Sequence, residues 1–301
     1  MISIICFFRD SIESLNWCNE NSIIINNQII SEVIHFIEKD SEINLKAAPK
    51  LRVIYGGNIH QRYIKFSAID LLGSFILLSA ADDKIISLPD DNFLTSLDSD
   101  SIGVSPFNLW KSSVSSSTSN SLDLRSDSDI ERYRNYLSPP NPGDNSCFYG
   151  IFKKNAFLNS FKMHLDIIKT FQQLQGSEVI PHANDWGLLL TLLKLGKIQK
   201  CYDFVIARDE TPPSDHITKT NFTESDFQDL FSHPMGFIAF TLILLGVADS
   251  ESIKKLHNWY EIKNNQFNLL RNFKINNLTE SQFSKIYSNL FMQIMQPQKL
   301  S

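Results

Sequence analysis

The chain has 301 residues, 43% of them hydrophobic, enough for one large domain or two smaller ones with a sizeable core. Its formal net charge of -5 and its lack of a basic block argue against nucleic-acid binding through phosphate contacts. Its four cysteines show no metal-ligand spacing such as C-x-x-C, which predicts reduced thiols in a cytosolic protein.

The N-terminal segment is apolar, but it is too short to span a membrane and lacks the basic region of a signal peptide. The longest apolar stretch, Met235–Ala248, is also too short to span. We expect a buried helix there, with an interfacial anchor as the alternative. These features predict a cytoplasmic protein, and an interfacial helix would add peripheral contact with the inner face of a membrane.

Strand and helix signals alternate over the first hundred residues. Strands are predicted at Ile2–Phe8, Leu51–Tyr55 and Phe75–Ala81. Helical spacing is found at Ile29–Ile37 and Tyr63–Leu72, and Ser22–Asn26 is a short β-branched run. Strands that alternate with helices indicate βαβ units and a parallel sheet.

Two adjacent carboxylates, Asp82 and Asp83, follow the apolar run that ends at Ala81. Open α/β sheets bind ligands beyond the carboxyl ends of their strands. Paired carboxylates there suit a divalent cation that also holds phosphates. The alternative is a polar turn that ends the strand, and the dipeptide by itself favours this alternative.

The middle of the chain changes in composition. Lys111–Asp129 is rich in Ser and Asp and predicts a flexible loop, either a lid or a disordered insertion. The elements expected after it are a stiff turn at Pro139–Gly143, a strand at Cys147–Phe152, helices at Ala156–Gln175 and from near Asp185 to Gly196, and a strand at Lys197–Val205.

From about residue 220 the chain is predicted to be all helix. Asn221–Phe227 and Asn277–Phe283 resemble each other, and each places Thr as N-cap ahead of Phe. This recurrence is either an internal repeat or a repeated helix start, and we favour the repeated helix start.

Three features in chain order carry a family resemblance: the strand ending at Arg9, the strand ending in Ala81-Asp82-Asp83, and Pro142–Phe152 followed by His182–Trp186. They resemble the family-2-type glycosyltransferases of the GT-A fold, in the subgroup with an Asp-Asp-Asp-like motif and a late Asp-Trp. The likeness covers roughly residues 1–205. It implies an α/β fold class with a mixed, mostly parallel sheet flanked by helices. Residues 1–205 would form the nucleotide-sugar-binding catalytic domain, and residues 206–301 an α-helical C-terminal extension.

The resemblance also implies roles for single residues. Asp82 would face the ribose of the nucleotide-sugar, and Asp83 would coordinate Mg²⁺ or Mn²⁺ at the diphosphate. Asp185 would be the general base that takes the proton of the acceptor hydroxyl. Arg9 and Asn58 occupy positions near the nucleotide or donor sugar.

Lys84 departs from the family pattern, since it stands where a third carboxylate is expected. Its charge could be directed at the diphosphate, which would allow transfer without a metal, or it could be a solvated loop charge. Asp185 could equally be an N-cap, and Arg9 could pair with Asp10 or Glu13.

The leading hypothesis is a glycosyltransferase that moves a hexose from a nucleotide-sugar to a glycan or lipid-linked hydroxyl, with inversion. The first alternative is a non-catalytic protein of the same fold that acts as an interaction or nucleotide-binding module. A nucleotidyltransferase is the second, but the segment Phe8–Ser11 is not the glycine-rich phosphate loop that such an enzyme needs.

Overall fold

The computed structural model describes residues 1–39, 50–111, 116–119, 124–138, 145–175, 184–209 and 233–259. The chain divides into two compact units built from interleaved segments. Unit 1 comprises Met1–Asp127, Asp144–Lys162 and Leu195–Glu210, and unit 2 comprises Ser128–Gly143, Met163–Lys194 and Thr211–Ser301. The domain boundary expected after residue 205 stays a prediction.

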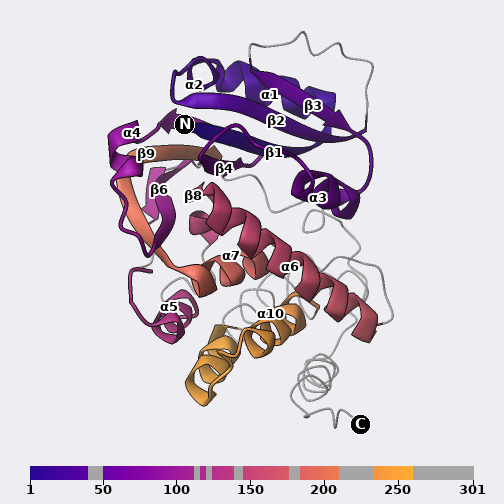
Figure 1. Ribbon diagram of the computed structural model, residues 1–301, viewed down its shortest axis with the longest axis vertical. Helices are drawn as coiled ribbons and strands as arrows, with labels where there is room; N and C mark the ends of the chain where they lie inside the picture. The colour runs from indigo at the N-terminus through magenta and orange to yellow at the C-terminus, as the bar shows by residue number, and fades with distance from the viewer. Residues whose placement is uncertain are drawn as a thin grey trace. The chain divides into compact units, whose positions relative to one another are not determined.

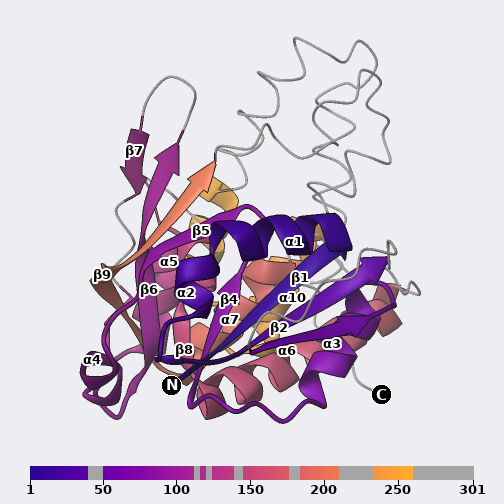
Figure 2. The ribbon, with the colours of Figure 1, turned by 90° about the horizontal axis from the view of Figure 1, so that it is seen from above.

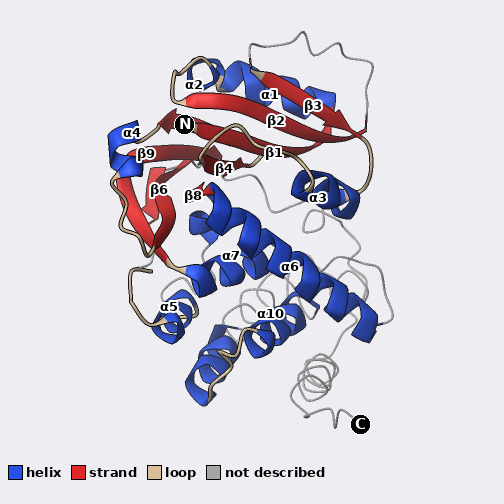
Figure 3. Cartoon of the chain, viewed as in Figure 1, coloured by secondary structure: helices blue, strands red, loops and turns tan. Residues whose placement is uncertain are grey.

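A single mixed sheet forms the centre of unit 1 (Figure 1, Figure 3). Its strands in the described residues are β1 (Ile2–Asp10), β2 (Ile30–Lys39), β3 (Leu51–Tyr55), β4 (Phe75–Ser79), β5 (Asp83–Ser87), β6 (Ser101–Lys111), β7 (Ser116–Ser119), β8 (Ile151–Lys153) and β9 (Lys197–Asp209). The order across the sheet is β3-β2-β1-β4-β8-β6-β9-β5, and β7 pairs with β6. β1 runs parallel to β2 and β4, and β2 runs parallel to β3, as expected from βαβ units.

Helices cover both faces of this sheet in unit 1. They are α1 (Ser11–Glu20), α2 (Ser22–Ile25), α3 (Ile59–Ser67), α4 (Asp91–Thr95), the 3₁₀ turn η1 (Asn145–Tyr149) and the start of α6 (Lys154–Gln175). Figure 2 shows α1 and α2 together over one face of the strands, where α1 contacts β1, β2 and β5. The core beneath α1 includes Cys6, Phe8 and Trp17.

An aromatic cluster fills the opposite face of β1. Phe7 stacks on Phe36 with ring centroids 5.0 Å apart, and Phe66 of α3 lies 4.9 Å from Phe161 of α6. β1 is therefore buried on both faces, which explains its continuous apolar run.

Unit 2 contains helices in its described part: α5 (Asp129–Tyr136), the second half of α6, α7 (Asn184–Leu195), α10 (His233–Leu244) and a helix over residues 250–259. α5 holds the end of α7, because Tyr133 Oη donates to the carbonyl of Leu190 at 2.9 Å and Arg132 Nε donates to that of Leu193 at 2.9 Å. The side chains of Phe237, Ile238 and Leu242 in α10 are fully buried, so the prediction of a buried helix there is confirmed. No helix within the described residues is long and apolar enough to cross a membrane.

Several predicted elements differ from the structure. The helix predicted at Ile29–Ile37 is wrong, because this segment forms β2, whose apolar residues serve both faces of the sheet. The short run at Ser22–Asn26 contains helix α2, and the helix predicted at Tyr63–Leu72 spans Ile59–Ser67 instead. The strand predicted at Cys147–Phe152 is a 3₁₀ turn followed by the short β8.

The predicted Ser-rich loop is partly folded, since β7 pairs with β6 and a bridge joins Leu124 to Ile198. The two similar segments at Asn221–Phe227 and Asn277–Phe283 lie outside the described residues.

Candidate functional site

The strand order of unit 1 reverses between β1 and β4. β3, β2 and β1 follow one direction across the sheet, and β4 lies on the other side of β1. Cys6 of β1 pairs with Ser79 of β4, so the residues after both strands leave the sheet at the same edge. Such a reversal creates a crevice at the carboxyl ends, where open α/β sheets bind ligands. The structure thus brings Arg9 and the Asp82–Lys84 segment to one edge of the sheet.

Arg9 is the penultimate residue of β1 and is held by the first turn of α1. Its Nη2 lies 2.6 Å from Oε1 of Glu13, and its backbone N–H donates to Oε2 of Glu13 at 2.8 Å. Of the two carboxylates expected to pair with Arg9, Glu13 therefore does so. The Arg9 side chain stays 74% exposed, so its guanidinium, which has five donors, can reach a ligand as well.

Asp10 caps α1 at the same place. Its Oδ1 accepts hydrogen bonds from the backbone N–H groups of Ile12 and Glu13, at 2.9 and 3.0 Å. A helix N-terminus in this position of an α/β fold commonly binds phosphate. Here the carboxylate of Asp10 takes the place of such an anion.

The turn from β4 to β5 contains the paired aspartates. Asp82 is exposed at the tip, whereas Asp83 is only 1% exposed. The backbone N–H of Ala80 donates to Oδ2 of Asp83 at 2.7 Å, and the N–H of Asp83 donates to the carbonyl of Ala80 at 3.2 Å. Lys84, the next residue, is exposed. The two aspartates therefore differ: Asp82 faces solvent and Asp83 closes the turn.

These residues do not fit a Mg²⁺ or Mn²⁺ site. Within the described part of the chain, no three His, Cys, Asp or Glu side chains gather in a way that could hold an ion. The carboxylate of Asp83, the predicted metal ligand, is buried and bonded to the backbone of its own turn. Hard cations of this kind need several accessible oxygens and usually keep bound waters.

Buried polar side chains of α1 support the turn from beneath. Trp17 donates from Nε1 to Oγ of Ser79 at 3.0 Å. Asn21, which follows α1, donates from Nδ2 to the carbonyl of Asp83 at 3.0 Å and accepts from the N–H of Ile85 at 2.8 Å. Sequence reasoning missed Trp17 and Asn21, because no apolar periodicity marks α1.

A buried histidine extends this polar layer. Nδ1 of His35 in β2 lies 2.7 Å from Oγ of Ser14 in α1, and its ring packs 4.6 Å from that of Phe8. Burial lowers the pKa of His35 to about 3, so the ring is neutral.

Asn58 follows β3, which is separated from β1 by β2. Its Oδ1 accepts from the N–H of Gln61 at 3.0 Å, and Gln61 returns a bond to the Asn58 N–H, forming a capping box at the start of α3. Gly56 and Gly57 reach this cap with φ angles of +89° and +96°, which only glycine adopts readily. The structure does not bring Asn58 beside Asp82, and its donor contact stays a prediction.

Asp185 belongs to unit 2, in the first turn of α7. Its Oδ1 accepts from the N–H of Trp186 at 2.9 Å, and burial raises its pKa to about 6. The helix begins at Asn184, so Asp185 lies inside α7 rather than at its N-cap. The indole of Trp186 packs 5.0 Å from that of Trp259, in line with a core role for this tryptophan.

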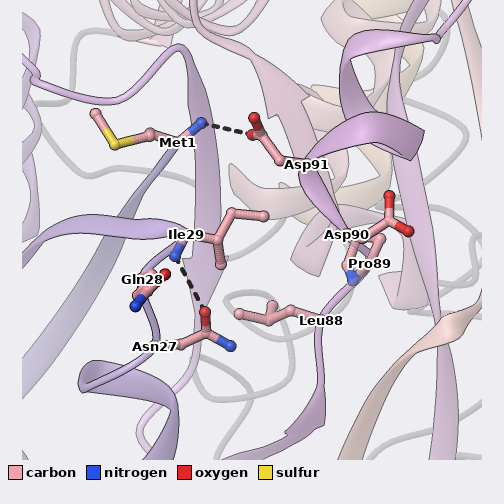
Figure 4. Close-up of a pocket in the computed structure, with 8 residues that line it drawn as sticks. All are labelled: Met1, Asn27, Gln28, Ile29, Leu88, Pro89, Asp90 and Asp91. Carbon is pink, nitrogen blue, oxygen red and sulfur yellow. Dashed lines mark hydrogen bonds and ion pairs between the residues drawn. The ribbon is translucent and has the colours of Figure 1, made fainter.

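A pocket of about 470 Å³ lies at the opposite edge of the unit 1 sheet (Figure 4). Its lining residues precede β1 and β2 or follow β5: Met1, Asn27, Gln28, Ile29, Leu88, Pro89, Asp90 and Asp91. The amine of Met1 pairs with Asp91 at 3.1 Å across it. This pocket is at the amino ends of β1 and β2 and at the carboxyl end of β5, and is separate from the candidate site.

Solved structures of Staphylococcus aureus TarS residues 1–349 resemble this chain over almost its whole length. The fold is shared with TarS. The structure in complex with UDP matches with a TM-score of 0.56 at 15% identity, over 98% of this chain and 81% of that one. The structure in complex with UDP-GlcNAc matches with a TM-score of 0.54 at 14% identity, over 97% and 81%.

At this identity the likeness to TarS concerns the fold, and it confirms the predicted GT-A-like α/β class. No protein-family model and no curated protein sequence matches the chain.

Proposed function

We propose that this chain is a glycosyltransferase that moves a hexose from a nucleotide-sugar to a hydroxyl group on a glycan or lipid-linked acceptor. The observation that carries the proposal is the reversal of strand order between β1 and β4, with Arg9 and Asp82–Lys84 at its edge. The fold shared with TarS structures that hold UDP and UDP-GlcNAc supports a nucleotide-sugar as the donor.

In this proposal the exposed side chains at the edge of the sheet bind different parts of the nucleotide-sugar donor. Asp82 accepts hydrogen bonds from the ribose hydroxyls, since an ionised carboxylate is an acceptor only. Arg9 and Lys84 supply positive charge near the diphosphate, which develops negative charge as it leaves.

Asp185 is the proposed general base. A raised pKa of about 6 suits a base that works near neutral pH. It takes the proton of the acceptor hydroxyl while the new glycosidic bond forms and the bond to the nucleoside diphosphate breaks, which inverts the anomeric centre. Peripheral membrane contact stays a prediction that belongs with a lipid-linked acceptor.

Binding of nucleoside diphosphates to the full chain, measured by calorimetry, tests the proposal. UDP or another nucleoside diphosphate should bind, and Arg9→Ala and Asp82→Ala should each weaken binding. Asp70→Ala, an exposed carboxylate before β4, serves as the control and should bind like the parent. Failure of every nucleotide to bind would refute the function. Binding without transfer to any acceptor would instead support the non-catalytic nucleotide-binding module.

A further inference from the structure

The carboxylate of Asp83 accepts a hydrogen bond from the backbone of its own turn. One oxygen accepts the N–H of Ala80 at 2.7 Å, while the backbone N–H of Asp83 returns to the carbonyl of Ala80 at 3.2 Å. The residue is 1% exposed. A hydrated divalent cation that bridges to a diphosphate needs a carboxylate at the surface. Asp83 does not present one.

Side chains of α1 and of Asn21 also hold β4 and β5, the strands on either side of the turn. Ser79 at the end of β4 accepts from the indole of Trp17, and the amide of Asn21 bonds to Asp83 and Ile85 at the start of β5. All of these contacts are buried, where loss of a partner is costly. Hydrogen bonds from α1 and Asn21 therefore hold the backbone of the turn and of the two strands that flank it.

The two exposed charged residues of this turn, Asp82 and Lys84, have opposite signs. Along β5 the buried residues Asp83 and Ile85 alternate with the exposed residues Lys84 and Ile86, so Lys84 points away from the face that buries Asp83. Among the described residues, Lys84 makes no ion pair or hydrogen bond through its side chain. Its ammonium is thus available to an anion, and lysine binds phosphate as a point charge.

We propose that this chain binds its nucleoside diphosphate without a divalent cation, and that the Lys84 ammonium supplies the positive charge in its place. The inference rests on the proposed function and concerns the same edge of the sheet. It follows from two features together: the carboxylate expected to hold a metal closes the turn, and a lysine stands where a further carboxylate is expected.

The test is calorimetry of the full chain with UDP, first in EDTA and then with Mn²⁺. We expect the same Kd in both conditions. Lys84→Ala should raise the Kd about 10- to 100-fold, the range for one charge-assisted hydrogen bond, and Lys84→Arg should restore much of the affinity. Lys162→Ala is the matched control, because Lys162 is an exposed lysine of unit 1 on a different element, helix α6.

The outcomes separate this inference from the proposed function. Binding that requires Mn²⁺ would overturn the inference and leave the glycosyltransferase proposal intact. A Kd for Lys84→Ala equal to that of the parent in EDTA would also overturn it. Failure of UDP, GDP, CDP and ADP to bind in either condition would instead count against the proposed function itself.

Discussion

Arg62 in α3 donates a hydrogen bond from Nη1 to the carbonyl of Phe8 at the end of β1, 2.7 Å away. Arg62 is 5% exposed, and its guanidinium also pairs with Glu38 of β2 at 3.1 Å. A single side chain thus joins the carboxyl-terminal parts of two neighbouring parallel strands, at the residue before Arg9 in β1.

Replacement of Arg62 by Ala should therefore destabilise the chain and weaken donor binding. It leaves the buried carbonyl of Phe8 without its donor, which costs about 1–3 kcal/mol. Urea unfolding and nucleotide calorimetry measure the two effects. Arg52→Ala, an exposed arginine in β3, should change stability by no more than about 0.5 kcal/mol. Equal effects of the two substitutions would contradict the role given to Arg62.

Asp185 should impose a pH dependence on turnover. As a base it must be ionised, so kcat should rise with pH through about 6 and level off above it. Asp185→Asn should lower kcat by about 10²- to 10⁴-fold while donor binding is kept. Asp166→Asn, an exposed carboxylate in α6, should keep the parent profile. An Asp185→Asn variant with full turnover would exclude Asp185 as the base.

Asp185 should also make the stability of the fold depend on pH, but stability should fall, where turnover rises, as pH increases. The pKa of Asp185 is raised from 3.8 to about 6 on folding, so the folded chain holds this proton more tightly than the unfolded chain. The contribution of Asp185 to stability is then lost as pH rises from about 4 to about 6. Urea unfolding across this range should show a smaller loss in Asp185→Asn than in the parent.

His35 should make the fold less stable at acidic pH. Its pKa falls from 6.5 to about 3 on folding because the ring is buried, so only the unfolded chain takes up a proton between these values. Stability should decrease as pH falls from about 6.5 towards 3, and urea midpoints at successive pH values measure this loss. The decrease should be smaller in His35→Gln. His257→Gln, an exposed position in unit 2, should retain the full decrease.

Gly187 in α7 has no room for a side chain. A Cβ atom there would lie 2.5 Å from Cε1 of Phe237 and 2.8 Å from Cε1 of His164. Gly187→Ala should cost about 1–3 kcal/mol in urea unfolding, the usual range for overpacking. Phe237→Leu in the same chain should recover part of that loss through removal of the clashing ring, and purely additive losses would argue against the clash.

The parts of the fold that could be predicted are those with a distinct pattern. The apolar runs of β1, β3 and β4 and the periodic stretch of α6 identify these elements directly. The sequence of β2 predicts a helix, because Ile30, Val33, Ile34 and Ile37 fit helical spacing as well as they fit a strand buried on both faces.

The elements that were missed bury polar side chains. α1 buries Ser11, Ser14 and Trp17, and β6 buries Ser105 and Asn108, so neither shows an apolar period. The positions of Arg9, Asp82 and Lys84 at one edge follow from strand order, and this part of the site could be predicted. The inward direction of Asp83 depends on Trp17 and Asn21, whose partners are far away in sequence.

The side-chain amide of Asn21 has a further consequence for β5, the strand at the edge of the sheet. It offers β5 one acceptor and one donor, bonding the N–H of Ile85 and the carbonyl of Asp83 as a neighbouring strand would. β5 is the last strand in the sheet order, and such a strand can recruit another chain through its unpaired backbone groups. Asn21 imitates a peptide unit and occupies two of these groups, so the residue that holds the aspartate turn also leaves the outer edge of β5 with fewer groups open to another strand.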